Sequence, residues 1–217
     1  MTSDVEQVLY ISLCMGFSLL VSAWLFFRIT GGLFNPEVAL ALLLVGAIKP
    51  IRFVLFVIAQ LVGSIVASAL VRVLTSQNLS VGTFLQQDIN LAQGVFIEMF
   101  ITCALVLSVL MLAAEKHQAT AFAPVGIGLT LFACHLFAVY YTGASMNSAR
   151  SFGPAVIAGF YSDHWVYWVG PILGSLLGAA FYGTMKYIHY GKLNPGQDAT
   201  NDLEAAHVTE EVRRNEV

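Results

Sequence analysis

Long uninterrupted apolar runs constrain this chain more than any other feature of its sequence. Apolar segments of about 20 residues are long enough to cross a lipid bilayer as helices. The chain contains five such runs, namely Val8–Phe27, Phe53–Val71, Gln93–Ala114, Ala119–Tyr141 and Trp165–Ile188. Only 11% of its residues are charged, whereas soluble domains average about 25%. Because a soluble bundle would need to bury all five runs, we expect an all-α membrane protein.

Two shorter apolar runs follow matched glycine-containing loops, GGLFNPEV at 31–38 and GASMNSAR at 143–150. Each loop reaches an asparagine, Asn35 or Asn147, whose side-chain oxygen can cap the first turn of a helix. Pro36 suits a first helical position, where its missing N–H group costs nothing. The predicted short helices run from Pro36 to about Val45 and from Ser148 to about Ala158. Both are too short to span a bilayer and fit re-entrant segments.

The basic residues give the chain an orientation. If both short helices re-enter the membrane, every Lys and Arg except Arg72 and Arg150 falls on one side. The positive-inside rule makes that side the cytoplasm, which then also holds the C-terminus. The two asparagine loops enter from opposite faces and can meet near the middle of the bilayer, as in inverted-repeat transport proteins.

The same count places Met1–Gln7 outside, although this segment lacks the basic region of an export signal. One further span before Met1 would put both termini in the cytoplasm and give each half three spans. Gln93–Ala114 precedes the asparagine-bearing unit of the second half, and the first half has no counterpart to it. We therefore expect that one helix is missing, through truncation, a gene-model error or genuine loss.

The order of these elements resembles the aquaporins of the major intrinsic protein family. The similar stretches are YISLCMGFSLL (10–20), VIAQLVGSIVASAL (57–70), GVFIEMF (94–100), HLFAVYYTG (135–143) and ARSFGPAV (149–156). Three further stretches resemble the orthodox fungal water channels, namely EKH (115–117), HWVYWVGPILG (164–174) and NPGQDA (194–199). The resemblance runs from about residue 8 to 199.

This resemblance implies an aquaporin-like, inverted-repeat, right-handed bundle of five spans and two re-entrant half-helices, without the first of the usual six spans. It implies a homotetramer that conducts water, and we expect it in the plasma membrane with a cytoplasmic C-terminus. The channel domain is predicted over residues 1–190. Residues 191–217 form a polar tail with too few apolar groups to fold.

Asn35 and Asn147 are the predicted pore residues. A helix N-terminus carries about half a positive charge, so two of them aimed at one point repel cations. An asparagine that caps with its oxygen keeps its NH2 group free to donate. We expect both asparagines to donate to one water oxygen, which interrupts the hydrogen-bonded file of water. The alternative is that both are only helix caps in a packed interior.

Arg150 stands three residues into the second short helix. A lipid-facing charge there would cost about 2.5–3.5 kcal/mol, so we predict that it lines an outer cavity. His135 lies about two turns before the loop and can reach the same constriction. The filter implied by the family consists of Met15, His135, Ala144 and Arg150. Water channels usually have phenylalanine where Met15 stands, so a softer constriction is expected. Ser151 stands where the glycerol-conducting branch has aspartate, which favours water.

Two residues depart from the family's Asn-Pro-Ala motif. Glu37 replaces the alanine of the first loop, and Ser148 replaces the proline of the second. The family fold places these positions close together, so we expect that Glu37 bonds Ser148 or is protonated. The alternative is that Glu37 faces the cytoplasmic vestibule. An ionised Glu37 beside the water file would weaken cation exclusion.

Two intramembrane polar residues are predicted to support the loops. The resemblance implies that Glu98 accepts backbone N–H bonds from the second loop, rather than relaying protons. Gln60 is expected to support the first loop. Gly170, Gly174 and Gly178 recur every four residues, which is typical of a close helix-packing face.

Three classes of function compete. A passive, water-selective pore that excludes ions and protons needs a continuous lumen. A non-conducting or degenerate membrane scaffold would suit the missing span and the altered motifs. An intramembrane enzyme that uses Glu98 and His135 is the weakest, because no nucleophile or metal-ligand spacing lies beside them. We therefore predict a water channel without enzymatic activity, cofactor, metal or nucleic-acid partner.

Overall fold

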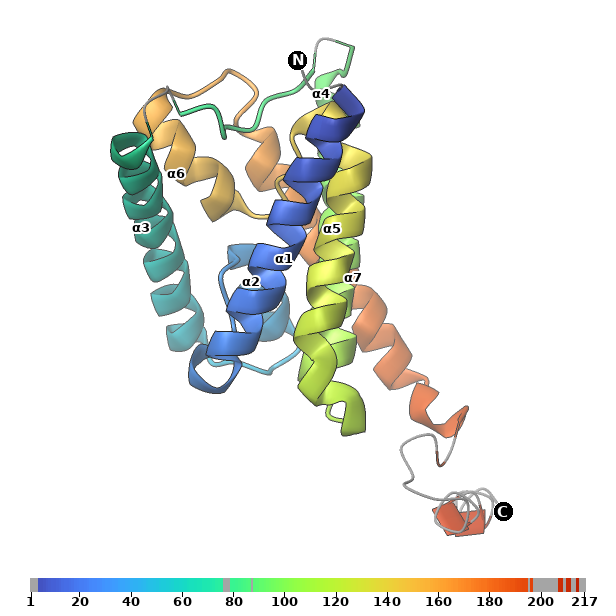
Figure 1. Ribbon diagram of the computed structural model, residues 1–217. Coiled ribbons are helices and arrows are strands. Elements are labelled where there is room, and N and C mark those ends of the chain that lie inside the picture. Colours follow the sequence, from blue (N-terminus) through green and yellow to red (C-terminus); the bar gives the residue numbers. More distant parts are fainter. Residues whose placement is uncertain are drawn as a thin grey trace.

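The computed structural model describes residues 4–75, 79–86, 88–194, 196, 207–208, 210–211 and 214. In this part of the chain every regular element is helical (Figure 1). The long helices are α1 (Asp4–Thr30), α3 (Pro50–Leu74), α4 (Leu91–Val109), α5 (Ala123–Thr142) and α7 (Val166–Tyr187). The short helices are α2 (Pro36–Leu44) and α6 (Ser148–Ala158). The remaining turns are a π-helical extension of α4 (Leu110–Ala114) and two 3-10 turns (Gln118–Phe122 and Tyr190–Lys192).

The predicted helices are confirmed. Five segments are long and apolar enough to cross a membrane, and they match the five predicted runs to within a few residues at each end. Both short helices begin at the predicted residues, Pro36 and Ser148. The division into residues 1–190 and a tail over 191–217 stays a prediction, because most of that tail lies outside the described residues.

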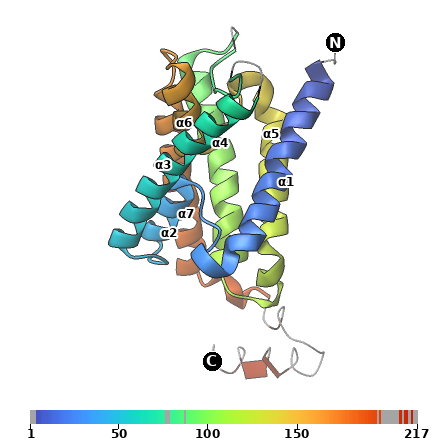
Figure 2. The ribbon, with the colours of Figure 1, turned by 60° about the vertical axis from the view of Figure 1, so that its left-hand side comes forward.

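Capping asparagines explain where the short helices begin. The Asn35 side-chain oxygen accepts hydrogen bonds from the backbone nitrogens of Glu37 (2.8 Å) and Val38 (3.2 Å). The Asn147 oxygen accepts one from the backbone nitrogen of Arg150 (3.0 Å). These contacts satisfy donors that a helix leaves unpaired in its first turn. The two helices lie in opposite halves of the bundle, α2 in the lower half and α6 in the upper half of Figures 1 and 2.

The two halves of the chain repeat one packing scheme. Both α1 and α5 end in a Thr-Gly-x-x-x-Asn sequence that leads into a short helix, at 30–35 and 142–147. Helix α1 packs along α5, while α3 packs on α6 much as α7 packs on α2 (Figure 2). Helix α4 packs along α7 and α5. Among the described residues, no helix plays the corresponding part against α3 and α1.

One side of the bundle is consequently open. Only 6% of the most apolar window of α3 is buried, against 44–50% for the spans that contain α4, α5 and α7. A groove of about 740 Å³ lies between α1, α3 and α6. The expectation that the chain lacks one helix stays a prediction. This groove is the surface against which such a helix would pack.

The predicted glycine face packs closely on α4. A Cβ atom on Gly170 would lie 2.7 Å from the Cβ of Glu98 and 2.9 Å from the carbonyl oxygen of Val95. Gly174 and Gly178 lie equally close to the following turns of α4. These glycines therefore let α7 approach the helix that carries Glu98.

We expect Gly174→Ala to destabilise the fold. The added methyl group would meet the backbone of α4, and such overpacking typically costs about 1–3 kcal/mol. Gly183→Ala, on the same helix, is the matched control, because its added methyl group would have no atom within 4 Å apart from its chain neighbours and the backbone of its own helix. Thermal melting of both variants in detergent checks the prediction. Equal melting temperatures for the two variants would contradict it.

A polar cluster ties the C-terminal end of the π-helical extension of α4 to α7. The Tyr182 hydroxyl donates to Glu115 at 2.6 Å, and the Lys186 ammonium lies 2.9 Å from the same carboxylate. The pKa of Glu115 lies below its ordinary value, chiefly because of the hydrogen bond from Tyr182 and further because of Lys186. Ionised Glu115 therefore favours the folded state.

The pH dependence of this contribution has a definite sign. A carboxylate whose pKa is lowered by folding stabilises the protein above its unfolded pKa, and this stabilisation is lost as the pH falls through the folded pKa. We expect Glu115→Gln to melt at a lower temperature than the unmodified protein at pH 7. The gap should close as the pH falls below 4.5, the ordinary value for this group. Melting curves across this pH range test it, and a gap independent of pH would contradict it.

Candidate functional site

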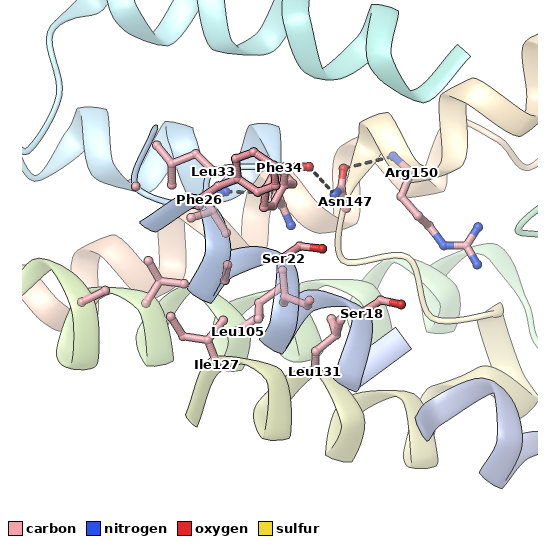
Figure 3. Close-up of a pocket in the computed structure, with 18 of the residues that line it drawn as sticks. Ser18, Ser22, Phe26, Leu33, Phe34, Leu105, Ile127, Leu131, Asn147 and Arg150 are labelled. Atoms are coloured by element: carbon pink, nitrogen blue, oxygen red, sulfur yellow. Dashed lines mark hydrogen bonds between the residues drawn. The ribbon is translucent and has the colours of Figure 1, made fainter. Parts of the chain in front are cut away.

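A cavity of about 280 Å³ lies between α1, α2, α4 and α5, where the two asparagine loops meet (Figure 3). It extends from Ala113, in the π-helical extension of α4, to Arg150 on α6. Most of its wall is apolar. The polar side chains that line it are Ser18, Ser22, Asn35, Ser145, Asn147 and Arg150. An apolar cavity with a few polar groups suits a small polar molecule that is not held tightly.

The two asparagines cross from one loop to the other. The Asn35 amide nitrogen donates to the carbonyl oxygen of Met146 at 2.7 Å, and the Asn147 amide nitrogen donates to that of Phe34 at 2.9 Å. Figure 3 shows Asn147 between this carbonyl and the backbone nitrogen of Arg150. An amide nitrogen carries two hydrogens, so each asparagine keeps one N–H group that has no hydrogen-bond partner among the described residues. Both residues line the cavity.

Arg150 projects from the first turn of α6 toward the loop that follows α3. Its Nη1 donates to the carbonyl oxygen of Val81 at 2.7 Å. The guanidinium lies beside the cavity in Figure 3. It adds a fixed positive charge to the two helix N-termini that meet nearby.

Glu98 holds the second loop in place. Its carboxylate accepts hydrogen bonds from the backbone nitrogens of Ser145 and Met146, both at 2.9 Å, and from the Thr142 hydroxyl at 2.6 Å. The predicted contacts to the loop are therefore present. In the first loop, the Gln60 amide donates to the carbonyl oxygen of Leu33 at 3.2 Å.

Glu37 is buried at the meeting point of the two short helices. Its side chain is 2% exposed and accepts a hydrogen bond from the backbone nitrogen of Ser148 at 3.0 Å. The two residues are in contact, as expected, although the donor is the Ser148 backbone nitrogen and not its hydroxyl group. The alternative that Glu37 faces the cytoplasmic vestibule is wrong, because it is buried and does not line the cavity.

Comparison with known proteins agrees with this architecture. The family model described as major intrinsic protein matches residues 1–182. The chain belongs to the major intrinsic protein family. This membership makes it one of a non-enzymatic group of aquaporin-type channel proteins, and its five apolar helices make it an integral membrane protein.

Fungal members of the major intrinsic protein family are similar over most of the chain. Aquaporin-1 of Laccaria bicolor is 74% identical over 201 residues, which cover 92% of this chain and 64% of that relative. Aquaporin-7 of Botryotinia fuckeliana is 52% identical over 198 residues, which cover 91% of this chain and 44% of that relative. The chain thus spans less than two thirds of the length of these relatives.

A solved structure in the comparison shares the fold of this major intrinsic protein. The X-ray structure of the aquaglyceroporin from Plasmodium falciparum superposes with a TM-score of 0.67, over 85% of this chain and 82% of that one. The two sequences are 20% identical. The predicted aquaporin-like fold is therefore confirmed.

The filter residues implied by the major intrinsic protein family divide into two groups. Met15 and Arg150 line the cavity, whereas His135 and Ala144 do not and are fully buried. The His135 Nδ1 donates to the carbonyl oxygen of Leu131 at 2.9 Å, and its Nε2 has no partner in the described part of the chain. Because Leu131 lines the cavity one turn earlier on α5, His135 continues the same helix face toward the C-terminal end of α5. Their joint role as a filter stays a prediction.

Sequence reasoning missed several hydroxyl groups of this major intrinsic protein. Ser18 and Ser22 line the cavity from successive turns of α1. Their four-residue spacing within an apolar run is the signal that would have found them. The Ser151 hydroxyl hydrogen-bonds that of Ser145 in the second loop (2.5 Å) and that of Thr83 (2.8 Å). Nothing in the local sequence indicates this second cluster, since its members come from separate segments.

Proposed function

We propose that this chain forms a passive pore that conducts water and excludes ions and protons. The observation that carries the proposal is the pair of asparagine amides, each with one N–H group that has no partner among the described residues, beside a single cavity. A water molecule between them would accept two hydrogen bonds, and its own hydrogens would then point away from both asparagines. A proton could not pass along a water file whose orientation is interrupted in this way.

Electrostatics support the exclusion of cations. Two half-helices begin at Asn35 and Asn147, and each N-terminus carries about half a positive charge. Arg150 adds a full positive charge on the outer side. Within a site of low dielectric, these charges act on a cation more strongly than they would in water. Water, which is neutral, is not opposed by them.

Selectivity for water over glycerol forms part of the same proposal. It is supported by Ser151, which follows Arg150 where the glycerol-conducting branch has aspartate, and by the His135 face that continues the cavity wall. We further propose a homotetramer in the plasma membrane with a cytoplasmic C-terminus. Chemical cross-linking in native membranes, with tetramers as the expected product, tests the assembly.

A non-conducting scaffold is the second candidate, and one observation favours it. The open groove beside α3 shares residues with the cavity wall, among them Met15, Asn147 and Arg150. A pore that is open on one side toward the bilayer would be filled or distorted by lipid. Under this alternative the chain is a membrane protein with an aquaporin fold that does not conduct water.

Stopped-flow light scattering of reconstituted vesicles separates the two candidates. We expect vesicles that contain the protein to shrink faster than empty vesicles in hyperosmotic sucrose, with no faster uptake of glycerol. Equal shrinkage rates for loaded and empty vesicles would favour the scaffold. Fast glycerol uptake would overturn the proposed selectivity while leaving a channel.

A further inference from the structure

The two asparagine loops differ at the first helical position. Pro36 begins α2 without a backbone N–H group, whereas Ser148 begins α6 and carries one. Ser148 is 1% exposed, so this extra donor points into a site without water access. A buried N–H group without an acceptor is costly. The replacement of proline by serine therefore creates a need for a new acceptor at this point.

The acceptor comes from the opposite half-helix. Glu37 Oε2 lies 3.0 Å from the Ser148 backbone nitrogen. The backbone of Glu37 is fixed on both sides, because its nitrogen donates to the Asn35 side chain at 2.8 Å and its oxygen accepts from the Ser175 hydroxyl at 2.7 Å. The first turn of a helix also favours a carboxylate. The two departures from the family motif are thus in direct contact.

We propose that Glu37 and Ser148 are a compensating pair, in which the Glu37 carboxyl group positions the start of α6 and thereby aims the Asn147 amide into the cavity. Three hydrogen bonds join the loops here: Glu37 with Ser148, Asn147 with Phe34, and Asn35 with Met146. Ser148 is the residue next to Asn147, so a shift of the first moves the second. The inference deepens the proposed water pore and rests on it.

Glu37 acts through hydrogen bonding and not through charge beside the water. Neither Glu37 nor Ser148 lines the cavity, and both are almost fully buried. Glutamine at position 37 keeps an oxygen that can accept from the Ser148 nitrogen. Alanine removes the acceptor, and proline at position 148 removes the donor. Either of these last two substitutions therefore removes the hydrogen bond between Glu37 and Ser148.

The test is a double-mutant cycle in reconstituted vesicles. We expect Glu37→Ala and Ser148→Pro each to lower water permeability per protein by about fivefold, because losing one hydrogen bond lowers by about that factor the population in which the start of α6 keeps its present position. The double variant Glu37→Ala/Ser148→Pro should return to within about twofold of the unmodified protein, because interacting residues are not additive. Glu37→Gln should retain the permeability and the proton leak of the unmodified protein.

Several outcomes would overturn the pair. Unchanged permeability in Glu37→Ala would do so, as would a double variant no better than the worse single variant. If Glu37→Gln fails like Glu37→Ala, or changes the proton leak, then charge and not hydrogen bonding is what matters. Where a single variant does not fold, recovery of folding in the double variant supports the pair. If neither the single variant nor the double variant folds, the pair is overturned.

Failure of the proposed function can be told apart from failure of the pair. If the unmodified protein does not accelerate vesicle shrinkage, the water pore is wrong. The same cycle measured as melting temperature in detergent still tests the pair. A double variant that melts above both single variants supports the contact, and additive losses contradict it.

Discussion

Replacement of Ser22 by tryptophan is expected to reduce the water permeability of reconstituted vesicles to that of empty vesicles. Ser22 lines the cavity from α1, next to Ala23 and one turn after Ser18. The bulky indole would enter a cavity of only about 280 Å³ whose opposite wall includes Leu105, Ile127 and Leu131. A close-packed wall cannot yield without cost, so the passage closes. Stopped-flow shrinkage measures the effect.

Val21→Trp is the matched control for this prediction. Val21 precedes Ser22 on α1, is 51% exposed and does not line the cavity. It should leave water permeability unchanged while adding the same side chain to the same helix. Permeability that survives Ser22→Trp, in a protein that reconstitutes at the same density, would mean that water does not pass through this cavity.

Loss of the Glu98 carboxylate is expected to have the largest effect on stability. Glu98→Ala leaves the backbone nitrogens of Ser145 and Met146 without the acceptor that each has now. An unsatisfied buried donor costs about 1–3 kcal/mol, so two cost about 2–6 kcal/mol. This is a large share of the stability of a typical protein. We expect little folded protein, with a melting temperature far below that of the unmodified chain.

Glu98→Gln gives the graded comparison. Glutamine keeps one oxygen but turns the other acceptor into a donor that faces an N–H group. Its melting temperature should therefore lie between those of Glu98→Ala and the unmodified protein. If Glu98→Ala were to fold and melt normally, the second loop would be held by something other than this carboxylate.

Local features of the sequence were sufficient to predict the helices. An apolar run of about 20 residues specifies a span wherever it occurs, and α1, α3, α4, α5 and α7 match these runs. The asparagine caps depend on neighbours two or three residues away, so the starts of α2 and α6 at Pro36 and Ser148 could also be predicted. The family resemblance added the contacts of Glu98 and the closeness of Glu37 and Ser148.

Other features could not be predicted because they join distant segments. The sequence suggested that each asparagine keeps both hydrogens of its NH2 group free for water. In the structure one hydrogen of each amide is donated to the backbone carbonyl oxygen of the residue that precedes the other asparagine. Ser18 and Ser22 are two hydroxyls within an apolar span, and only the packing of α1 against α5 turns them toward the cavity. His135 and Ala144 were expected at the constriction, and both are fully buried without lining this cavity.

The sequence by itself determined that this is a membrane protein, how many helices the described chain has and where they lie in the sequence, and the residues at which the two short helices begin. These properties follow from hydrophobicity and from hydrogen bonds within one turn, which need no other segment. Only the tertiary structure decided which groups the asparagine amides meet: Asn35 donates to the carbonyl oxygen of Met146, 111 residues away, and Asn147 donates to that of Phe34, 113 residues away. Such contacts depend on the packing of whole helices, and a local pattern carries no information about their distance or burial.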